Sequence, residues 1–384
     1  MKLMNRFYSL LALLLVGSAS LQAQSDPFPD RAIPARKYQG SMTCTSQVVM
    51  NGEIVTDAVV ATYCGDDFRG KNSTGKDPGH PNHVCLTIYG DHTITKQNIH
   101  FKVYMQGKIF TFNPDPAFVY TFNGSVGSAA NPYIIDITPV SMANNADNTA
   151  TLTTWKDKTC DVALTGRTLY KDGDWNTICL PFTLTASEVN EHLENPAGLM
   201  TLSSSSFDST TGTLTMNFVD ATSIVAGKPY IVKWTTIGED LVNPVFTGVT
   251  ISDATENIET DYVDFLGIYS TTVIYEDGAD KHNLYLGSGN NLYYPSREGY
   301  SLKACRAYFR LKNGLTAGDP TAGVRAFALN FDDDDEPTGI RTLSADGRTS
   351  SPSRTGTYTL DGRKVTGQLQ PGLYIVNGKK MVIK

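Results

Sequence analysis

Residue pairs that favour the tightest β-turns, each flanked by alternating apolar residues, constrain the fold of this chain most. Asn51-Gly52, Asp361-Gly362 and Asn377-Gly378 adopt with little strain the positive φ values that a type I′ hairpin turn requires. Gln106-Gly107 follows residues 99–105, in which apolar and polar side chains alternate. The chain is therefore expected to consist mainly of antiparallel strands joined by short turns.

The composition supports this expectation. The 384 residues include 33 Gly, 18 Pro and 19 Tyr, which favours strands and turns over helices. A chain of this length has room for two or three domains of roughly 100 to 200 residues each. We predict an all-β fold class with two β-sandwich modules, at residues 35–140 and 151–331, and a small C-terminal antiparallel domain at residues 357–384.

One short helix is expected in the second module. Thr185 and Glu188 have the spacing of a capping box, and Val189 and Leu193 lie one turn apart on a single helix face. The pattern predicts a helix from about Ala186 to Glu194.

The first 23 residues have the features of a signal peptide. Lys2 and Arg6 are followed by an apolar run, Leu10 to Val16, and then by small residues that favour cleavage after Ala23. The apolar run is far shorter than the ~20 residues that cross a bilayer, and no later apolar segment is longer, so no membrane span is expected. The run is not followed by a cysteine that could receive a lipid, so any surface attachment is expected through the C-terminal end.

An acidic run marks a boundary after the second module. Residues 332–356 begin with five consecutive carboxylates and continue with a stretch rich in Ser, Thr, Gly and Arg, which predicts a solvated linker. Calcium binding is the alternative, with Asp332 and Asp334 as weak candidate ligands. The run lacks the spaced acidic ladder that wraps one ion.

Motifs for catalysis, metal binding and cofactor binding are scarce. His80 and His83 are weak candidates for a metal site, because the surrounding Pro and Gly residues predict an irregular loop. A nucleophile elbow and a phosphate-binding loop are both missing, so we predict no catalytic or cofactor-binding residue and no cofactor. Glycosidases need only two carboxylates, which any part of the chain could supply, so the sequence leaves that class open.

The six cysteines permit two interpretations. An exported chain enters an oxidising compartment, where disulfides form. However, Cys179 and Cys305 lie in apolar runs, where unpaired cysteines serve as small buried hydrophobic residues. The spacings fit no zinc site. The formal net charge of −7 comes without a basic stripe, so nucleic acid is not expected as a partner.

The C-terminal segment carries a specific resemblance. Residues 372–380 read Gly-Leu-Tyr-Ile-Val-Asn-Gly-Lys-Lys, and a basic residue, Lys384, follows four positions later. This ending resembles the C-terminal sorting domains of Bacteroidetes proteins that the type IX system exports. The resemblance implies transit through the periplasm, the secretion machinery as a partner, and a final location outside the cell or on the outer-membrane surface.

Two further sets of phrases resemble secreted Bacteroidetes proteins. Residues 38–43, 60–70, 86–90 and 101–104 look like a recurrent module of such proteins, in which Arg69-Gly70 is expected to form a turn. Residues 169–182, 226–232 and 307–311 are similar to phrases in large exported proteins of Prevotella and Bacteroides. No activity follows from either likeness. Trp175 and Phe182 lie in apolar strand context, so we expect core positions rather than a sugar-binding platform.

One modification site is suggested by a short motif. Asp208-Ser209-Thr210 resembles the Bacteroidetes O-glycosylation motif, which makes Ser209 a candidate site in a loop expected over residues 203–212.

Together these features predict a secreted or cell-surface binding protein without catalytic activity, whose ligand is a glycan or a host or envelope protein. The alternatives are an extracellular hydrolase acting on polysaccharide or peptide, and a structural component of a surface assembly.

Overall fold

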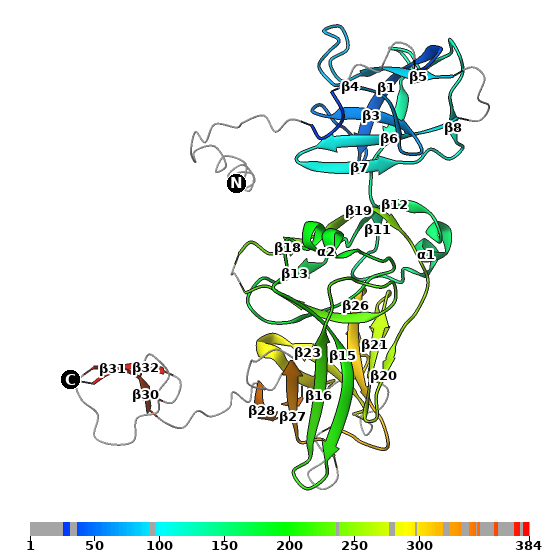
Figure 1. The fold of residues 1–384 in the computed structure, drawn as a ribbon. Coiled ribbons are helices and arrows are strands. Elements are labelled where there is room, and N and C mark those ends of the chain that lie inside the picture. The colour runs from blue at the N-terminus through cyan, green and yellow to red at the C-terminus, as the bar shows by residue number, and fades with distance from the viewer. Residues whose placement is uncertain are drawn as a thin grey trace, which may run out of the picture. The chain divides into compact units, whose positions relative to one another are not determined.

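The protein is all-β and divides into two compact units, unit 1 (Met1–Thr138) and unit 2 (Pro139–Lys384) (Figure 1). The computed structural model describes residues 26–30, 37–91, 97–235, 238–275, 281–295, 298–317 and 323–331 in full. It also describes the backbone of residues 338–342, 344–345, 357–359, 372–376 and 379–383. Residues 1–23, with the predicted cleavage site after Ala23, lie outside these ranges.

Unit 1 is a sandwich of two sheets. In the first sheet, β1 (Gly40–Met50) pairs antiparallel with β5 and β2 along one edge and parallel with β9 and β10 along the other. The second sheet has the order β4-β3-β6-β7, with β8 also paired to β6. The remaining strands are β2 (Glu53–Ile54), β3 (Val59–Cys64), β4 (Asp67–Ser73), β5 (Val84–Gly90), β6 (Asn98–Met105), β7 (Lys108–Phe112), β8 (Phe118–Val119), β9 (Ser125–Val126) and β10 (Tyr133–Asp136).

Alternating side chains hold the two sheets together. Every second residue of β5 is buried, as are Ile99, Phe101 and Val103 of β6, so each strand turns one face to the core. The Tyr133 ring of the first sheet lies 5.9 Å from the Phe101 ring and 5.0 Å from the Phe118 ring of the second. These aromatic contacts join the two faces of the sandwich.

The predicted turns have different outcomes. Gln106 and Gly107, at φ 49° and 78°, join β6 to β7 as predicted. Asn51 and Gly52 also turn the chain, but their hairpin extends only over the two residues of β2. The following strand, β3, lies in the second sheet between β4 and β6. Three consecutive residues of β3 are buried, which fits a central strand covered on both faces rather than a hairpin arm.

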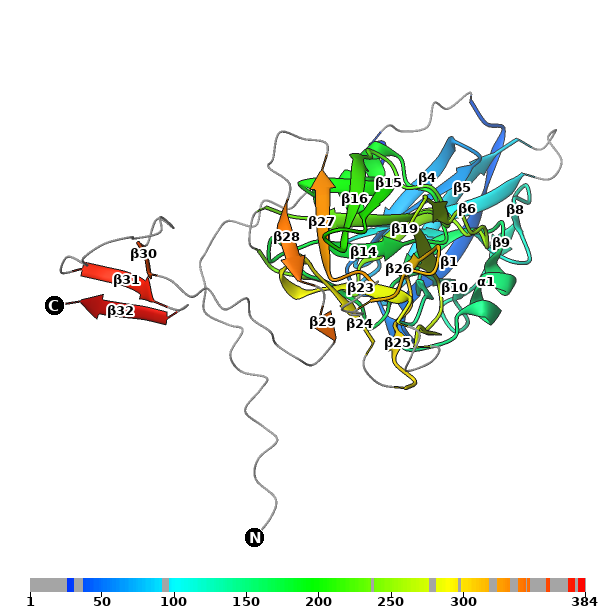
Figure 2. The same ribbon diagram turned by 90° about the horizontal axis from the view of Figure 1, so that it is seen from below.

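Two six-stranded sheets form the larger part of unit 2 (Figure 2). The first consists, in order, of β14 (Asn176–Cys179), β17 (Pro229–Lys233), β15 (Gly198–Asp208), β16 (Thr213–Asp220), β27 (Ala326–Phe331) and β28 (Thr338–Thr342). The second consists of β20 (Ile258–Glu259), β21 (Val263–Ile268), β26 (Arg306–Leu311), β23 (Asn283–Gly287), β24 (Asn291–Tyr294) and β29 (Ser344–Ala345).

Smaller sheets complete unit 2. They are β11 (Val140–Ser141) with β12 (Thr159–Ala163) and β19 (Val245–Thr250), β13 (Thr168–Leu169) with β18 (Leu241–Val242), and β22 (Thr272–Val273) with β25 (Ser301–Leu302). A single 3-10 turn, η1 (Ser288–Asn290), precedes β24.

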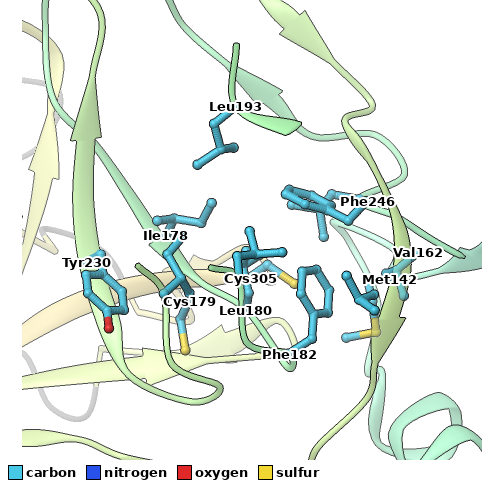
Figure 3. Close-up of a cluster of buried hydrophobic side chains, with 14 of the residues drawn as sticks. Met142, Val162, Ile178, Cys179, Leu180, Phe182, Leu193, Tyr230, Phe246 and Cys305 are labelled. Atoms are coloured by element: carbon cyan, nitrogen blue, oxygen red, sulfur yellow. The ribbon is translucent and has the colours of Figure 1, made fainter. Parts of the chain in front are cut away.

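Unit 2 has two main apolar cores. Between the six-stranded sheets, the Phe218 ring meets the rings of Phe265 and Phe309 edge to face, each at 6.3 Å. The other core gathers side chains from β14, β17, β19 and the loops around them (Figure 3). There the rings of Phe182 and Phe246 lie 5.1 Å apart, so Phe182 occupies the predicted core position.

The predicted helix is present as α2 (Ala186–His192), and its capping box is complete. The Glu188 backbone N–H donates to Thr185 Oγ1, and the Thr185 N–H donates to Glu188 Oε2 at 2.8 Å. The helix ends two residues earlier than predicted, with Leu193 as a buried C-cap.

A second helix, α1 (Thr149–Trp155), was not expected. Four of its seven residues are threonine, which has low helix propensity, and its N-cap residue Asn148 makes no side-chain capping bond. Among the described residues, no helix is both long enough and apolar enough to span a membrane.

Part of the predicted linker belongs to the sheets of unit 2. Residues 338–342 form β28, which pairs antiparallel with β27, and residues 344–345 form β29, which pairs with β24. The tail forms a separate antiparallel sheet of β30 (Thr357–Thr359), β31 (Gly372–Val376) and β32 (Lys379–Ile383). Asp332, Asp334 and the predicted turn at Asp361-Gly362 lie outside the described residues.

Candidate functional site

A cavity of about 420 Å³ in unit 2 is the main candidate for a binding site. Its volume suits a small ligand, such as one or two sugar rings. The lining combines aromatic, cationic and anionic side chains, which come from residues 167–177 in and around β13 and β14, from β23 with η1, from Tyr300 and Leu302 at β25, and from the start of β26. Those used below are Arg167, Tyr170, Asp172, Asp174, Trp175, Tyr285, Tyr300 and Arg306.

The loop between β13 and β14 is held in shape by Asn176. The Tyr170 N–H donates to Asn176 Oδ1 at 3.0 Å, and Asn176 Nδ2 donates to the Tyr170 carbonyl at 2.9 Å. This two-point clamp closes the base of the loop. At its tip Gly173 has φ 91°, a conformation that L side chains rarely adopt. The loop residues that line the cavity are therefore positioned before any ligand arrives.

Aromatic rings form much of the lining. Tyr285 and Tyr300 stack with their centroids 4.9 Å apart and their planes 21° apart. Trp175 is buried, as predicted for a core residue, yet it also borders the cavity. Its ring lies 5.1 Å from the Phe331 ring and 4.6 Å from Lys233 Nζ. Tyr170, in contrast, is 54% exposed. Apolar ring faces of this kind suit the C–H faces of a sugar.

Two carboxylates at the cavity support the loop. Asp172 Oδ1 accepts the Asp174 N–H at 3.0 Å, and Asp174 Oδ2 accepts the Gly289 N–H at 2.5 Å. Within the described residues neither carboxylate forms an ion pair. Each has a second oxygen that can still accept a hydrogen bond from a ligand.

Arg167 is a structural cation at the cavity. It is only 3% exposed, and its guanidinium donates to the carbonyls of Thr177 at 2.6 Å and Cys305 at 3.2 Å. It thereby ties the β14 strand to the turn before β26. Its Nε is buried without a hydrogen-bond partner in the described structure.

Arg306 is the least satisfied group of the cavity. Its Nη1 is buried without a hydrogen-bond partner, and no described residue forms a hydrogen bond or ion pair with its guanidinium. Burial lowers the pKa of Arg306 from its ordinary value to about 10, so the side chain is still charged at neutral pH. Withdrawing a charge from water without a described residue to bind it is costly, and an anionic ligand would reduce that cost.

His80 and His83, the weak metal candidates, are brought together in a unit 1 loop. Their rings stack at 5.1 Å with an interplanar angle of 2°, and His80 Nδ1 lies 3.1 Å from Asp77 Oδ2. The Gly79 N–H, and then His80, hold the pKa of the Asp77 carboxyl below its ordinary value. Among the described residues, no group of three potential ligands gathers here or elsewhere.

The cysteines behave as buried hydrophobic residues more than as reactive groups. None of the six, all of which are described, forms a disulfide. Cys44, Cys160, Cys179 and Cys305 are buried, and burial raises the pKa of the Cys44 and Cys305 thiols to about 12. Neutral thiols of this kind are poor nucleophiles.

The structure corrects the expected position of Arg69. Arg69 and Gly70 lie within strand β4 beside a β-bulge and do not form a turn. A Cβ on Gly70 would lie 2.2 Å from the Thr87 carbonyl oxygen, so this close approach of two strands requires glycine. Arg69 is 5% exposed and donates to the Tyr89 carbonyl and to Gln97 Oε1 at 3.1 and 2.8 Å.

Ser209 is exposed, but its surroundings differ from the prediction. Residues 203–208 belong to strand β15, so the loop extends only from Ser209 to Gly212. Asp208 shapes this turn by accepting the Thr210 N–H and the Thr211 hydroxyl, both at 2.8 Å. The strand was missed because its serine-rich sequence has little of the β-branched and aromatic character typical of strands.

The comparison of the sequence with protein-family models and with curated proteins gave no match.

Proposed function

We propose that this chain is an exported, non-catalytic binding protein and that the cavity of unit 2 holds its ligand. The observation that carries the proposal is the combination, in one cavity of about 420 Å³, of stacked aromatic rings with a half-buried guanidinium to which no described residue binds. Sites that recognise small molecules typically pair apolar walls with a few fixed polar groups. A glycan offers both C–H faces and hydroxyl groups to such a lining.

A glycan array with the full chain tests this proposal. We expect saturable binding to at least one glycan. Replacing the exposed Tyr170 with Ala should weaken that binding by about fivefold, since an aromatic contact is worth about 1 kcal/mol. Tyr89→Ala is the matched control, because Tyr89 is also exposed but belongs to unit 1. If no glycan binds, or if both variants weaken binding equally, the cavity is not the glycan site.

A hydrolase is the second candidate, because Asp172 and Asp174 both line this aromatic cavity. Two carboxylates beside a sugar ring are the minimum equipment of a glycosidase. Incubating the full chain with any glycan that binds, and assaying for new reducing ends, separates the two functions. If reducing ends are released and either Asp172→Asn or Asp174→Asn abolishes the release, the protein is an enzyme. We expect no release of reducing ends.

Export rests on the resemblance of the tail, and the three-stranded sheet of β30 to β32 is compatible with a compact terminal module. We propose that residues 357–384 direct the protein through the secretion machinery to the exterior or to the outer-membrane surface. Deleting them should leave the protein in the periplasm of its native host, as fractionation would reveal. A truncated protein that still reaches the surface would rule out the sorting role.

A further inference from the structure

We infer that the unit 2 cavity recognises an anionic saccharide, whose acidic group binds at Arg306 and whose hydroxyl groups bind at Asp172 and Asp174. This inference rests on the proposed function and specifies its ligand. It follows from the charges of the lining, from the absence of partners for one guanidinium among the described residues, and from the position of the aromatic rings.

The guanidinium of Arg306 supplies the anion site. The Nη atoms of Arg167, at the same cavity, donate hydrogen bonds to backbone carbonyls, whereas no described residue accepts a hydrogen bond from Arg306. The planar guanidinium presents a fork of donors that matches a carboxylate or a sulfate. An acidic group entering the cavity would gain charged hydrogen bonds without having to displace any described residue from Arg306.

The two aspartates restrict the class of anion. Asp172 and Asp174 would repel a small inorganic anion or a polyphosphate, because both carboxylates line the same cavity. A sugar acid avoids this repulsion, since it carries its charge at one position and hydroxyl donors at several others. Hydroxyl groups directed to the aspartates and an acidic group directed to Arg306 would fix the orientation of one ring.

The aromatic lining matches the remaining surface of a sugar. The stacked pair of Tyr285 and Tyr300 offers apolar surface against which C–H groups of a pyranose can pack. The cavity therefore contains a complementary partner for each of the three parts of a sugar acid: charge, hydroxyl groups and ring face.

Isothermal titration of the full chain with sialyllactose, sulfolactose, trigalacturonic acid and neutral lactose tests the inference. We expect at least one acidic probe to bind about tenfold or more tightly than lactose, because a hydrogen bond to a charged group contributes about 1.4 kcal/mol or more. The sialyl and sulfo probes share the lactose core, so their ranking distinguishes a carboxylate from a sulfate.

Variants assign the effect to Arg306. Arg306→Gln should reduce the affinity for the acidic probe to that for lactose, and Arg306→Lys should restore part of it. Lys158→Gln, which removes one exposed positive charge of unit 2 outside the cavity, should leave the affinity unchanged. Tryptophan fluorescence and near-ultraviolet circular dichroism verify that each variant is folded.

The outcomes separate this inference from the proposed function. Equal affinity for acidic and neutral probes, or an acidic affinity that Arg306→Gln and Arg306→Lys both leave intact, overturns the anion site but leaves glycan binding in place. Failure of every glycan on the array to bind overturns the proposed function, and the inference falls with it.

Discussion

One arginine in each unit is largely withdrawn from solvent, Arg69 buried in unit 1 and Arg306 half-buried in unit 2, and the two residues differ in what surrounds them. Arg69 of unit 1 donates to a carbonyl and to Gln97, lies 3.3 Å from Asp67 Oδ2, and stacks over the Tyr38 ring at 4.4 Å. Arg306 of unit 2 has no hydrogen bond or ion pair with any described residue. Burial alone therefore does not reveal a role. The partners of the buried charge distinguish an arginine that stabilises the fold from one that is available to a ligand.

The strongest test of this contrast is Arg69→Ala. Removing a buried, paired guanidinium leaves the Tyr89 carbonyl and Gln97 without their donor, so unit 1 should lose about 3 to 5 kcal/mol of stability. All three tryptophans, Trp155, Trp175 and Trp234, belong to unit 2, so fluorescence reports that unit alone. The loss should therefore appear in urea unfolding followed by far-ultraviolet circular dichroism. A loss below about 1 kcal/mol would mean that the cluster is not structural.

Alkaline pH should destabilise unit 2 through its buried thiols. Burial raises the folded-state pKa of Cys305 from 9.0 to about 12 and also raises that of Cys179. The thiols therefore favour folding fully below pH 9, and this contribution is lost as pH rises toward 12, because the unfolded state loses its protons first. Near pH 10.5, each of these thiols should lower the free energy of unfolding by about 2 kcal/mol relative to its value at neutral pH.

Tryptophan fluorescence during urea unfolding at several pH values measures this loss. Above pH 9, the free energy of unfolding of Cys305→Ala should decline less steeply than that of the unmodified protein, because one buried thiol is missing. The variant also leaves a small space in the core, which lowers its stability at every pH. The decline of each protein is therefore measured relative to its own stability at neutral pH. An unchanged slope would show that the Cys305 thiol does not titrate with unfolding.

Arg306→Met should have a small effect of opposite sign to that of Arg69→Ala. The substitution replaces a half-buried charge, to which no described residue binds, with an apolar side chain of similar length, so the stability of unit 2 should stay the same or rise by about 1 kcal/mol. Fluorescence-detected urea unfolding measures it. A loss of about 3 kcal/mol would instead assign Arg306 a structural role and remove the contrast with Arg69.

Thiol labelling gives the mildest test, because it leaves the fold unchanged. Cys85 is exposed and Cys64 is half-buried, and both belong to unit 1, whereas the other four cysteines are buried. A thiol reagent at neutral pH should therefore modify two groups quickly and the remaining four only after unfolding. Rapid reaction of a third thiol, located by peptide mapping, would mean that one of the cores opens.

The sequence was sufficient for the features that depend on local chemistry. The turn at Gln106-Gly107 and the capping box of Thr185 and Glu188 are decided by neighbouring residues, and both are present in the structure. The all-β class follows from the same local patterns. Strand partners are a different matter, because they depend on which faces are buried. The Asn51-Gly52 pair predicts a hairpin of β1 with the strand that follows, but the next long strand, β3, lies inside the second sheet.

The cavity could not be predicted from sequence. Its lining comes from residues 167–177, 285–288 and 300–307, which are brought together by the pairing of β23 with β26, by the Arg167 hydrogen bonds to Thr177 and Cys305, and by the hydrogen bond from Gly289 to Asp174. One signal was present: Arg306 stands at the head of a strand in which Ala307, Tyr308, Phe309 and Leu311 are buried, a position where a charge needs an explanation. The resemblance to exported proteins in this strand covers residues 307–311 and therefore does not include Arg306.

The pairing of β28 and β29 with the sheets of unit 2 determines where the tail can be cut. A passenger fused to residues 332–384 would carry two strands whose edges had lost their partners, and such edges promote aggregation. A body truncated after residue 331 would expose one edge of β27 in the same way. Beyond Ala345, only the eleven residues 346–356 separate these strands from β30, which sets a tether of at most about 40 Å. A transplantable tail should therefore begin at residue 346.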